Sequence, residues 1–237
     1  MEQVLDRFEE VQTDDAFALQ NSQILRVRLD DETLKAKSGS MVAFQGDLKF
    51  EAASEGGFGR MLKQAFSSED VDLMNVTGTG EVFLTANGQE LHVIDLEGDE
   101  LTCNGDALIS FTDDVDWDIK KVKGFGGRLA GGWSNVTLSG NGKVCLASDG
   151  NPVRLRTAEA PTFVDPEAAV AWSSNLEANV SRDFGGLKSV MRGGTGEGKR
   201  IEFAGDGWVL VQPSEAALAD RVTTLETKVS SLESRPS

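Results

Sequence analysis

The stretch GTGEVFL, residues 78–84, occurs in three related forms along the chain. The second form, GNGKVCL (140–146), begins 62 residues after the first, and the third, GDGWVLV (205–211), begins 65 residues after the second. Apolar residues alternate with other residues after each glycine pair, as in a half-buried β-strand. A phosphate-binding loop is excluded, because it needs a helix N-terminus where this chain has a strand pattern. We therefore interpret six glycines as structural, allowing a bulge or a close backbone approach: Gly78, Gly80, Gly140, Gly142, Gly205 and Gly207.

The first two copies stay similar beyond the glycines. Asn87-Gly88 follows the first strand pattern and Asp149-Gly150 follows the second. Such dipeptides favour positive φ and are typical of two-residue hairpin turns. We expect residues 78–94 and 140–156 to form two superposable β-hairpins. They indicate repeat units near 70–122 and 134–182, with a third partial copy at 201–213.

The rest of the chain supports an all-β fold. From Phe17 onward the apolar period is close to two, with frequent turn residues. We expect an acidic N-terminal segment (1–16) and then a domain of duplicated antiparallel β lobes with stacked sheets (17–213). One interruption predicts a short amphipathic helix, whose apolar face would carry Met61, Leu62, Ala65 and Phe66.

The C-terminal segment has a different period. Residues 214–234 predict a coiled-coil helix, because apolar residues recur at spacings of 4, 3, 4 and 3. The seam residues are Leu218, Val222, Leu225, Val229 and Leu232. The flanking charged residues are Arg221 and Lys228 at position g, and Glu226 and Glu233 at position e. Charges matched in this way predict self-association as a dimer or trimer; the alternatives are a helix packed on its own β domain and a frayed tail.

Composition restricts the function classes. The formal net charge of the 237-residue chain is −16, so it would repel phosphate, and we expect no nucleic-acid binding. No apolar run reaches membrane-spanning length, and the N-terminus has no apolar signal region, so a cytoplasmic location is expected. Cys103 and Cys145 lie in strand patterns without metal-site spacing, which predicts buried free thiols.

Candidate catalytic and metal-binding residues are few. His92 is the single histidine, it has no cysteine or histidine partner in pattern, and no nucleophile-elbow motif accompanies it. The acidic run TDDVDWD lacks the glycine and terminal glutamate of an EF-hand, so we interpret it as a solvated strand face. Its carboxylates are Asp113, Asp114, Asp116 and Asp118. We therefore assign no catalytic, cofactor-binding or metal-binding residue and expect no cofactor.

The glycine-rich loop KGFGGRLAGGW (123–133) allows two interpretations. Its apolar residues Phe125, Leu129 and Trp133 could fold under a connector between repeats. Alternatively, they could contact a membrane surface or a protein partner.

Several motifs together resemble those of the Altered Inheritance of Mitochondria 24 family, over about residues 17–213. They are SGSMVAFQGDLKF (38–50), GGFGRMLKQAF (56–66), GTGEVFLTANG (78–88), LSGNGKVCLASDG (138–150) and GWVLVQPS (207–214). The resemblance implies a fold similar to the tryptophan RNA-binding attenuator protein. It also implies a link to mitochondrial inner-membrane organisation, which is associated with fungal members, but it brings no catalytic residues.

The expected function is therefore that of a non-enzymatic structural or interaction protein that forms a homo-oligomer. The alternative is a small-ligand binder or enzyme that uses a cleft between the lobes. RNA binding by analogy of fold is a weaker alternative, which the negative charge disfavours.

Overall fold

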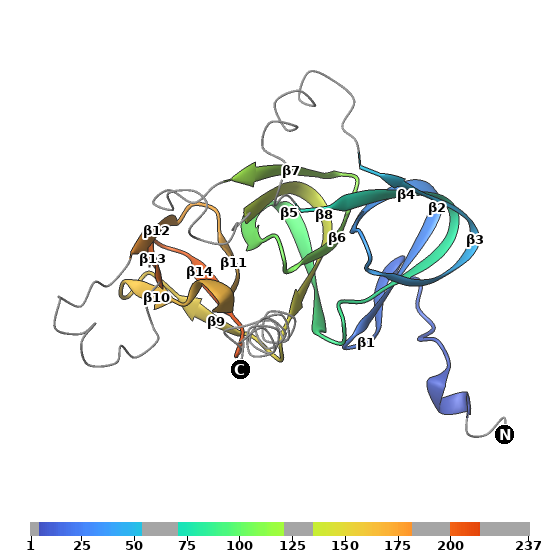
Figure 1. Cartoon of the computed structure of the whole chain (residues 1–237), viewed down its shortest axis with the longest axis horizontal. Coiled ribbons are helices and arrows are strands. Elements are labelled where there is room, and N and C mark those ends of the chain that lie inside the picture. Colours follow the sequence, from blue (N-terminus) through green and yellow to red (C-terminus); the bar gives the residue numbers. More distant parts are fainter. Residues whose placement is uncertain (1–4, 54–70, 121–134, 182–199, 214–237) are drawn as a thin grey trace, which may run out of the picture.

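A computed structural model describes residues 5–53, 71–120, 135–181 and 200–213 (Figure 1). These residues form fourteen strands and two short 3₁₀ turns, η1 (Asp6–Phe8) and η2 (Pro166–Ala168). The strands are β1 (Phe17–Asn21), β2 (Ile24–Lys37), β3 (Met41–Ala52), β4 (Leu73–Leu84), β5 (Glu90–Asn104), β6 (Leu108–Thr112), β7 (Val115–Lys120), β8 (Asn135–Ser148), β9 (Val153–Arg156), β10 (Thr162–Val164), β11 (Ala169–Ser173), β12 (Glu177–Ser181), β13 (Arg200–Ala204) and β14 (Trp208–Val211).

The strands form one large and one small antiparallel sheet. The order in the eleven-stranded sheet is β3-β4-β2-β6-β8-β5-β11-β14-β9, with β1 added to β2 and β7 added to β8. The three-stranded sheet has the order β10-β13-β12. The all-β prediction is confirmed. The helix expected around 61–66 and the C-terminal helix expected at 214–234 lie outside the described residues.

The two predicted hairpins are wrong. The turn at Asn87-Gly88 does form, with positive φ at both residues and a hydrogen bond from Gln89 N to Ala86 O of 2.8 Å. The strands on either side of it do not pair, because β4 pairs with β2 and β3 whereas β5 pairs with β8 and β11. In the same way, β8 and β9 follow each other in sequence but pair with other strands. Each turn therefore leads the chain from one lobe into the next.

Strand pairing divides the described chain into three lobes of one connectivity. Lobe 1 contains β2, β3 and β4; lobe 2 contains β5, β6 with β7, and β8; lobe 3 contains β9 with β10, β11 with β12, and β13 with β14. We call these the first, second and third strand of each lobe. In every lobe the third strand lies between the first and the second. The glycine pairs of lobes 1 and 2 lie within the third strands, at Gly78 and Gly80 on β4 and at Gly140 and Gly142 on β8. In lobe 3, Gly205 and Gly207 lie in the bend between β13 and β14.

The third strand of each lobe curls strongly. In lobe 1, Ser38 N donates to Asp72 O at 2.8 Å and Thr85 N donates to Ser40 O at 2.9 Å. The turn at 38–40 thus contacts both ends of β4, although twelve extended residues would span about 40 Å if they were straight. The curl is centred on Gly78, where φ is +120° and a Cβ would collide with the carbonyl oxygen of Asp47. A glycine is therefore required where two bent backbones meet.

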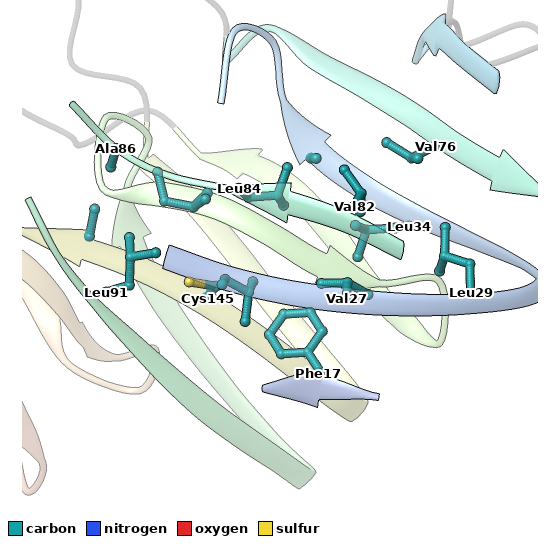
Figure 2. Close-up of a cluster of buried hydrophobic side chains, with 14 of the residues drawn as sticks. Phe17, Val27, Leu29, Leu34, Val76, Val82, Leu84, Ala86, Leu91 and Cys145 are labelled. Carbon is teal, nitrogen blue, oxygen red and sulfur yellow. The ribbon is translucent and has the colours of Figure 1, made fainter. Parts of the chain in front are cut away.

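Each lobe has its own buried apolar cluster. The lobe 1 cluster includes Val27, Leu34 and Val82, together with Leu91 and Cys145 from lobe 2 (Figure 2). The lobe 2 cluster includes Leu138 and the lobe 3 cluster includes Phe203, both fully buried. Because side chains from lobe 2 complete the cluster of lobe 1, these two lobes pack as one body.

The two cysteines lie in different buried clusters, Cys145 in that of lobe 1 and Cys103 in that of lobe 2. Cys103 and Cys145 are both free and buried, as the sequence predicted. Burial raises the pKa of each thiol to about 12, because the thiolate would be poorly solvated there.

Candidate functional site

His92 lies on β5 and contacts a turn of lobe 2. Its Nε2 is 2.7 Å from Ser148 Oγ, which in turn donates its hydrogen to Gly150 O at 2.7 Å. Since the hydroxyl hydrogen is used on Gly150, Ser148 Oγ must accept from a protonated Nε2. Burial lowers the pKa of His92, and the nearby Glu90 partly opposes this effect.

This geometry is the reverse of a serine nucleophile with its base. A general base must present an unprotonated nitrogen to the hydroxyl that it activates. Here the imidazole donates to the hydroxyl, so the pair holds the turn after β8 in place. The arrangement supports a structural role for His92.

The acidic run is placed as a solvated surface. Asp113 forms an ion pair with Lys35 Nζ at 2.9 Å, while Asp114, Asp116 and Asp118 are exposed. Within the described ranges, no group of three or more histidine, cysteine or acidic side chains is arranged to hold a metal ion. The arrangement fits the interpretation of this run as a solvated strand face.

The other sequence-predicted contact residues fall elsewhere. The loop residues Phe125, Leu129 and Trp133 lie outside the described residues. So do all nine oligomerisation residues, from Leu218 to Glu233. Their roles stay predictions.

The structure points instead to two exposed apolar strand edges, which sequence reasoning missed. On β3, Met41, Val42 and Phe44 are exposed by 36%, 56% and 47%. On β9 and β10, the exposed large side chains are Val153 (60%), Leu155 (37%) and Phe163 (50%). These six are the exposed large hydrophobic residues of the described strands.

The two edges lie at opposite ends of the molecule. β3 and β9 are the two terminal strands of the large sheet, and β10 is a terminal strand of the small one. Figure 1 shows β3 at one end of the long axis and β10 at the other. In the part of the chain that the structure describes, each edge therefore offers backbone groups that pair with no strand, together with apolar side chains, a combination that pairs readily with another strand. We call them the β3 edge and the β9–β10 edge.

A sequence signal for the β3 edge was available. The stretches VAFQ (42–45), ISFT (109–112) and VAWS (170–173) are similar to one another and belong to the second strands of lobes 1, 2 and 3. Aligning these three stretches, as well as the three glycine motifs, would have given Phe44, Phe111 and Trp172 equivalent positions in the repeat. Their different exposure, however, is visible only in the folded chain.

No described helix has the length and apolarity that crossing a membrane would require.

Comparison with known proteins supports this architecture. A crystal structure of a Streptococcus pyogenes protein from a structural genomics consortium superposes with a TM-score of 0.69. The alignment covers 90% of this chain and 97% of that chain at 18% identity, which establishes a shared fold. No curated protein matches the chain. The family model described as "Mitochondrial biogenesis AIM24" matches residues 17–214, which include all fourteen strands, and the chain therefore belongs to the AIM24 family.

Proposed function

We propose that this protein is a non-enzymatic, cytoplasmic structural or interaction protein that acts as a homo-oligomer. The observation that carries the proposal is the gathering of six exposed apolar side chains on two unpaired strand edges. Such surfaces recognise other polypeptides by adding a strand and burying side chains. The family's description in terms of mitochondrial biogenesis is compatible with a role in assembly.

The orientation of His92 also supports a non-enzymatic role. As the single histidine of the chain, it is the obvious candidate for a general base. Its Nε2–H donates a hydrogen bond to Ser148 Oγ, so Nε2 cannot accept the proton of that hydroxyl. The rival proposal of a ligand-binding cleft between the lobes therefore needs other residues.

A thermal-shift screen separates the two proposals. A ligand that binds only the folded state at 100 times its Kd stabilises it by about 2.7 kcal/mol. We expect unchanged melting temperatures with nucleotides, divalent metals and sugars. A saturable rise with one of these would favour the ligand-binding alternative.

Self-association through the C-terminal segment is the finer part of the proposal. It rests on the seam from Leu218 to Leu232 and on the matched charges beside it. We expect Leu225→Asp, in the middle of the seam, to lower the mass measured by light scattering. The matched control is Thr224→Asp, which adds the same charge one residue outside the seam. Equal masses for the two variants would refute the coiled coil.

A further inference from the structure

The joints between lobes follow one pairing rule. The first strand of lobe 1 pairs with the second strand of lobe 2, because Leu34, Lys35 and Ala36 lie opposite Thr112, Phe111 and Ser110. The first strand of lobe 2 pairs in the same way with the second strand of lobe 3. There, Leu101, Thr102 and Cys103 lie opposite Ser173, Trp172 and Ala171.

The aromatic residue of each joint is buried by it. Phe111 lies opposite Lys35 and is fully buried, and Trp172 lies opposite Thr102 with 3% exposure. Polar contacts add to both joints. Lys35 Nζ reaches Asp113 at 2.9 Å, and Thr102 Oγ1 lies 2.9 Å from Ser174 Oγ.

Among the described residues, the same rule leaves one edge without its partner strand in lobe 1 and one in lobe 3. Lobe 1 has a second strand, β3, which pairs with no other lobe in the part of the chain that the structure describes. Lobe 3 has a first strand, β9 with β10, and within the described residues no later lobe pairs with it. β3 is thus the kind of strand that would pair with β10, and β10 is the kind of strand that would pair with β3.

The register identifies the equivalent residue on β3. Phe44 pairs with Val82, as Phe111 pairs with Val144 and Trp172 with Val209. A neighbouring contact is repeated as well. The ring centroids of Phe44 and Phe50 are 5.2 Å apart, and those of Phe111 and Trp117 are 6.3 Å apart. Phe44 is thus the joint aromatic of lobe 1, but it is 47% exposed where its two counterparts are buried.

The neighbouring apolar position gives the same result. Val42 lies two residues before Phe44, as Ile109 and Val170 lie two residues before Phe111 and Trp172. Ile109 and Val170 are each 2% exposed, whereas Val42 is 56% exposed. The β3 edge therefore carries joint residues whose cover is absent from the described chain.

The opposite edge has the matching residue. Phe163 pairs with Glu202, as Lys35 pairs with Asn75 and Thr102 with Thr137. It therefore occupies the position that faces the joint aromatic. Phe163 is 50% exposed, and its ring lies 4.9 Å from the guanidinium carbon of Arg200.

We propose that the β9–β10 edge of one copy binds the β3 edge of a second copy, in the register of the internal joints. Phe163 of one copy then lies opposite Phe44 of the next. Thr162 and Val164 lie opposite Gln45 and Ala43. Cross-strand aromatic pairs stabilise antiparallel sheets, and this pair replaces the polar contacts of the internal joints.

This contact joins two different surfaces, so it is head-to-tail. Head-to-tail contacts produce a closed ring when the rotation between copies closes and an open filament when it does not. The contact uses residues 41–45 and 162–164 and does not depend on the C-terminal segment. It adds a second, separate route of self-association to the proposed function.

Complementation between two variants tests the proposal. All proteins are the full chain with Leu225→Asp, which removes the proposed coiled coil. We expect this parent to have a concentration-dependent mass above that of a monomer in light scattering. Phe44→Asp and Phe163→Asp should each give a monomer. Each variant retains only one of the two edges, so two copies of the same variant have no complementary pair of edges. An equimolar mixture should give twice the monomer mass and stop there, since only one pair of intact edges remains.

The matched control is Phe8→Asp. Phe8 is exposed by 67%, on neither edge, and its replacement should leave the parent's mass unchanged. A parent that stays monomeric at every concentration would overturn the proposal. So would two folded variants, verified by circular dichroism, whose mixture remains monomeric.

A cross-linking experiment covers the case in which an aspartate variant does not fold. Phe44→Cys and Phe163→Cys are mixed under oxidising conditions, where Cys103 and Cys145 are too buried to compete. We expect a disulfide between the two different variants, identified by mass spectrometry. Cross-links only between identical variants would show a symmetric contact and overturn the head-to-tail arrangement.

Discussion

Gly46 provides the sharpest test of why the strands of lobe 1 can curl. It lies on β3 directly opposite Gly80 of β4, with φ +96°. A Cβ on Gly46 would lie 2.6 Å from Thr79 O and 2.7 Å from Gly80 Cα. Both are backbone atoms, so no rotamer change can relieve the contact.

Gly46→Ala is therefore expected to destabilise the fold through two separate effects. A non-glycine residue at positive φ costs about 1–2 kcal/mol. Overpacking against a fixed neighbour adds about 1–3 kcal/mol. The sum of about 2–5 kcal/mol corresponds to a fall in Tm of roughly 4–20 °C for a domain of this size.

Gly88→Ala is the matched control, because its φ is +82° and nothing lies within 4 Å of the added Cβ. It should show only the backbone cost, about 1–2 kcal/mol. Urea unfolding monitored by circular dichroism measures both variants. Equal losses for the two variants would refute the argument that β3 and β4 need glycine because they approach so closely.

Three further predictions concern buried polar and titratable groups. Arg26 is 2% exposed and donates to three backbone carbonyl oxygens of the segment before β1. Arg26→Met should therefore make that segment more rapidly cleaved in limited proteolysis, whereas replacing the more exposed Arg28 by Met should not. Cys103 and Cys145 have a pKa of about 12 in the folded state, above that of an unfolded thiol, so the unfolded chain loses these protons first as pH rises. The free energy of unfolding should therefore fall between about pH 9 and pH 12, and both thiols should react with a labelling reagent only when the protein unfolds. His92 has a lowered folded pKa, so the unfolded state binds more protons in acid and stability should be lost below about pH 6.5; His92→Gln should reduce this acid dependence in urea titrations at pH 5 and pH 7.5.

The sequence predicted the strand content but not which strands pair. Alternation in GEVFL and GKVCL identifies β-strands, because the two faces of a sheet differ in burial. The turn at Asn87-Gly88 was also predictable from its need for positive φ. The expectation that β4 and β5 pair across it failed, because β4 pairs with β2 and β3 whereas β5 pairs with β8 and β11, which lie further away in the sequence. A turn dipeptide specifies its own backbone conformation but not which strands become neighbours in the sheet.

The exposed edges were hidden for a similar reason. Phe44 and Phe111 have the same local pattern in the sequence, since both follow an apolar and a small residue. Phe111 is buried where β6 pairs with β2 of lobe 1, whereas Phe44 is exposed on β3, which has no corresponding partner strand among the described residues. The lobe in which a residue lies, and not its local sequence pattern, therefore determines whether its side chain is exposed.

The arrangement of joints gives the chain an inherent order of assembly. Every lobe is built from strands close in sequence, so loop closure within a lobe is short and its strands can pair early. The first strand of lobe 1 pairs along one edge with β6, and the first strand of lobe 2 pairs with β11, so each of these edges stays unpaired until the next lobe has formed. During synthesis each finished lobe would present an unpaired edge at Leu34–Ala36, and later at Leu101–Cys103, that the next lobe covers as it leaves the ribosome. A pause between lobes would leave such an edge open to pairing with another nascent chain, so the speed of translation across these boundaries should influence whether the protein folds or aggregates.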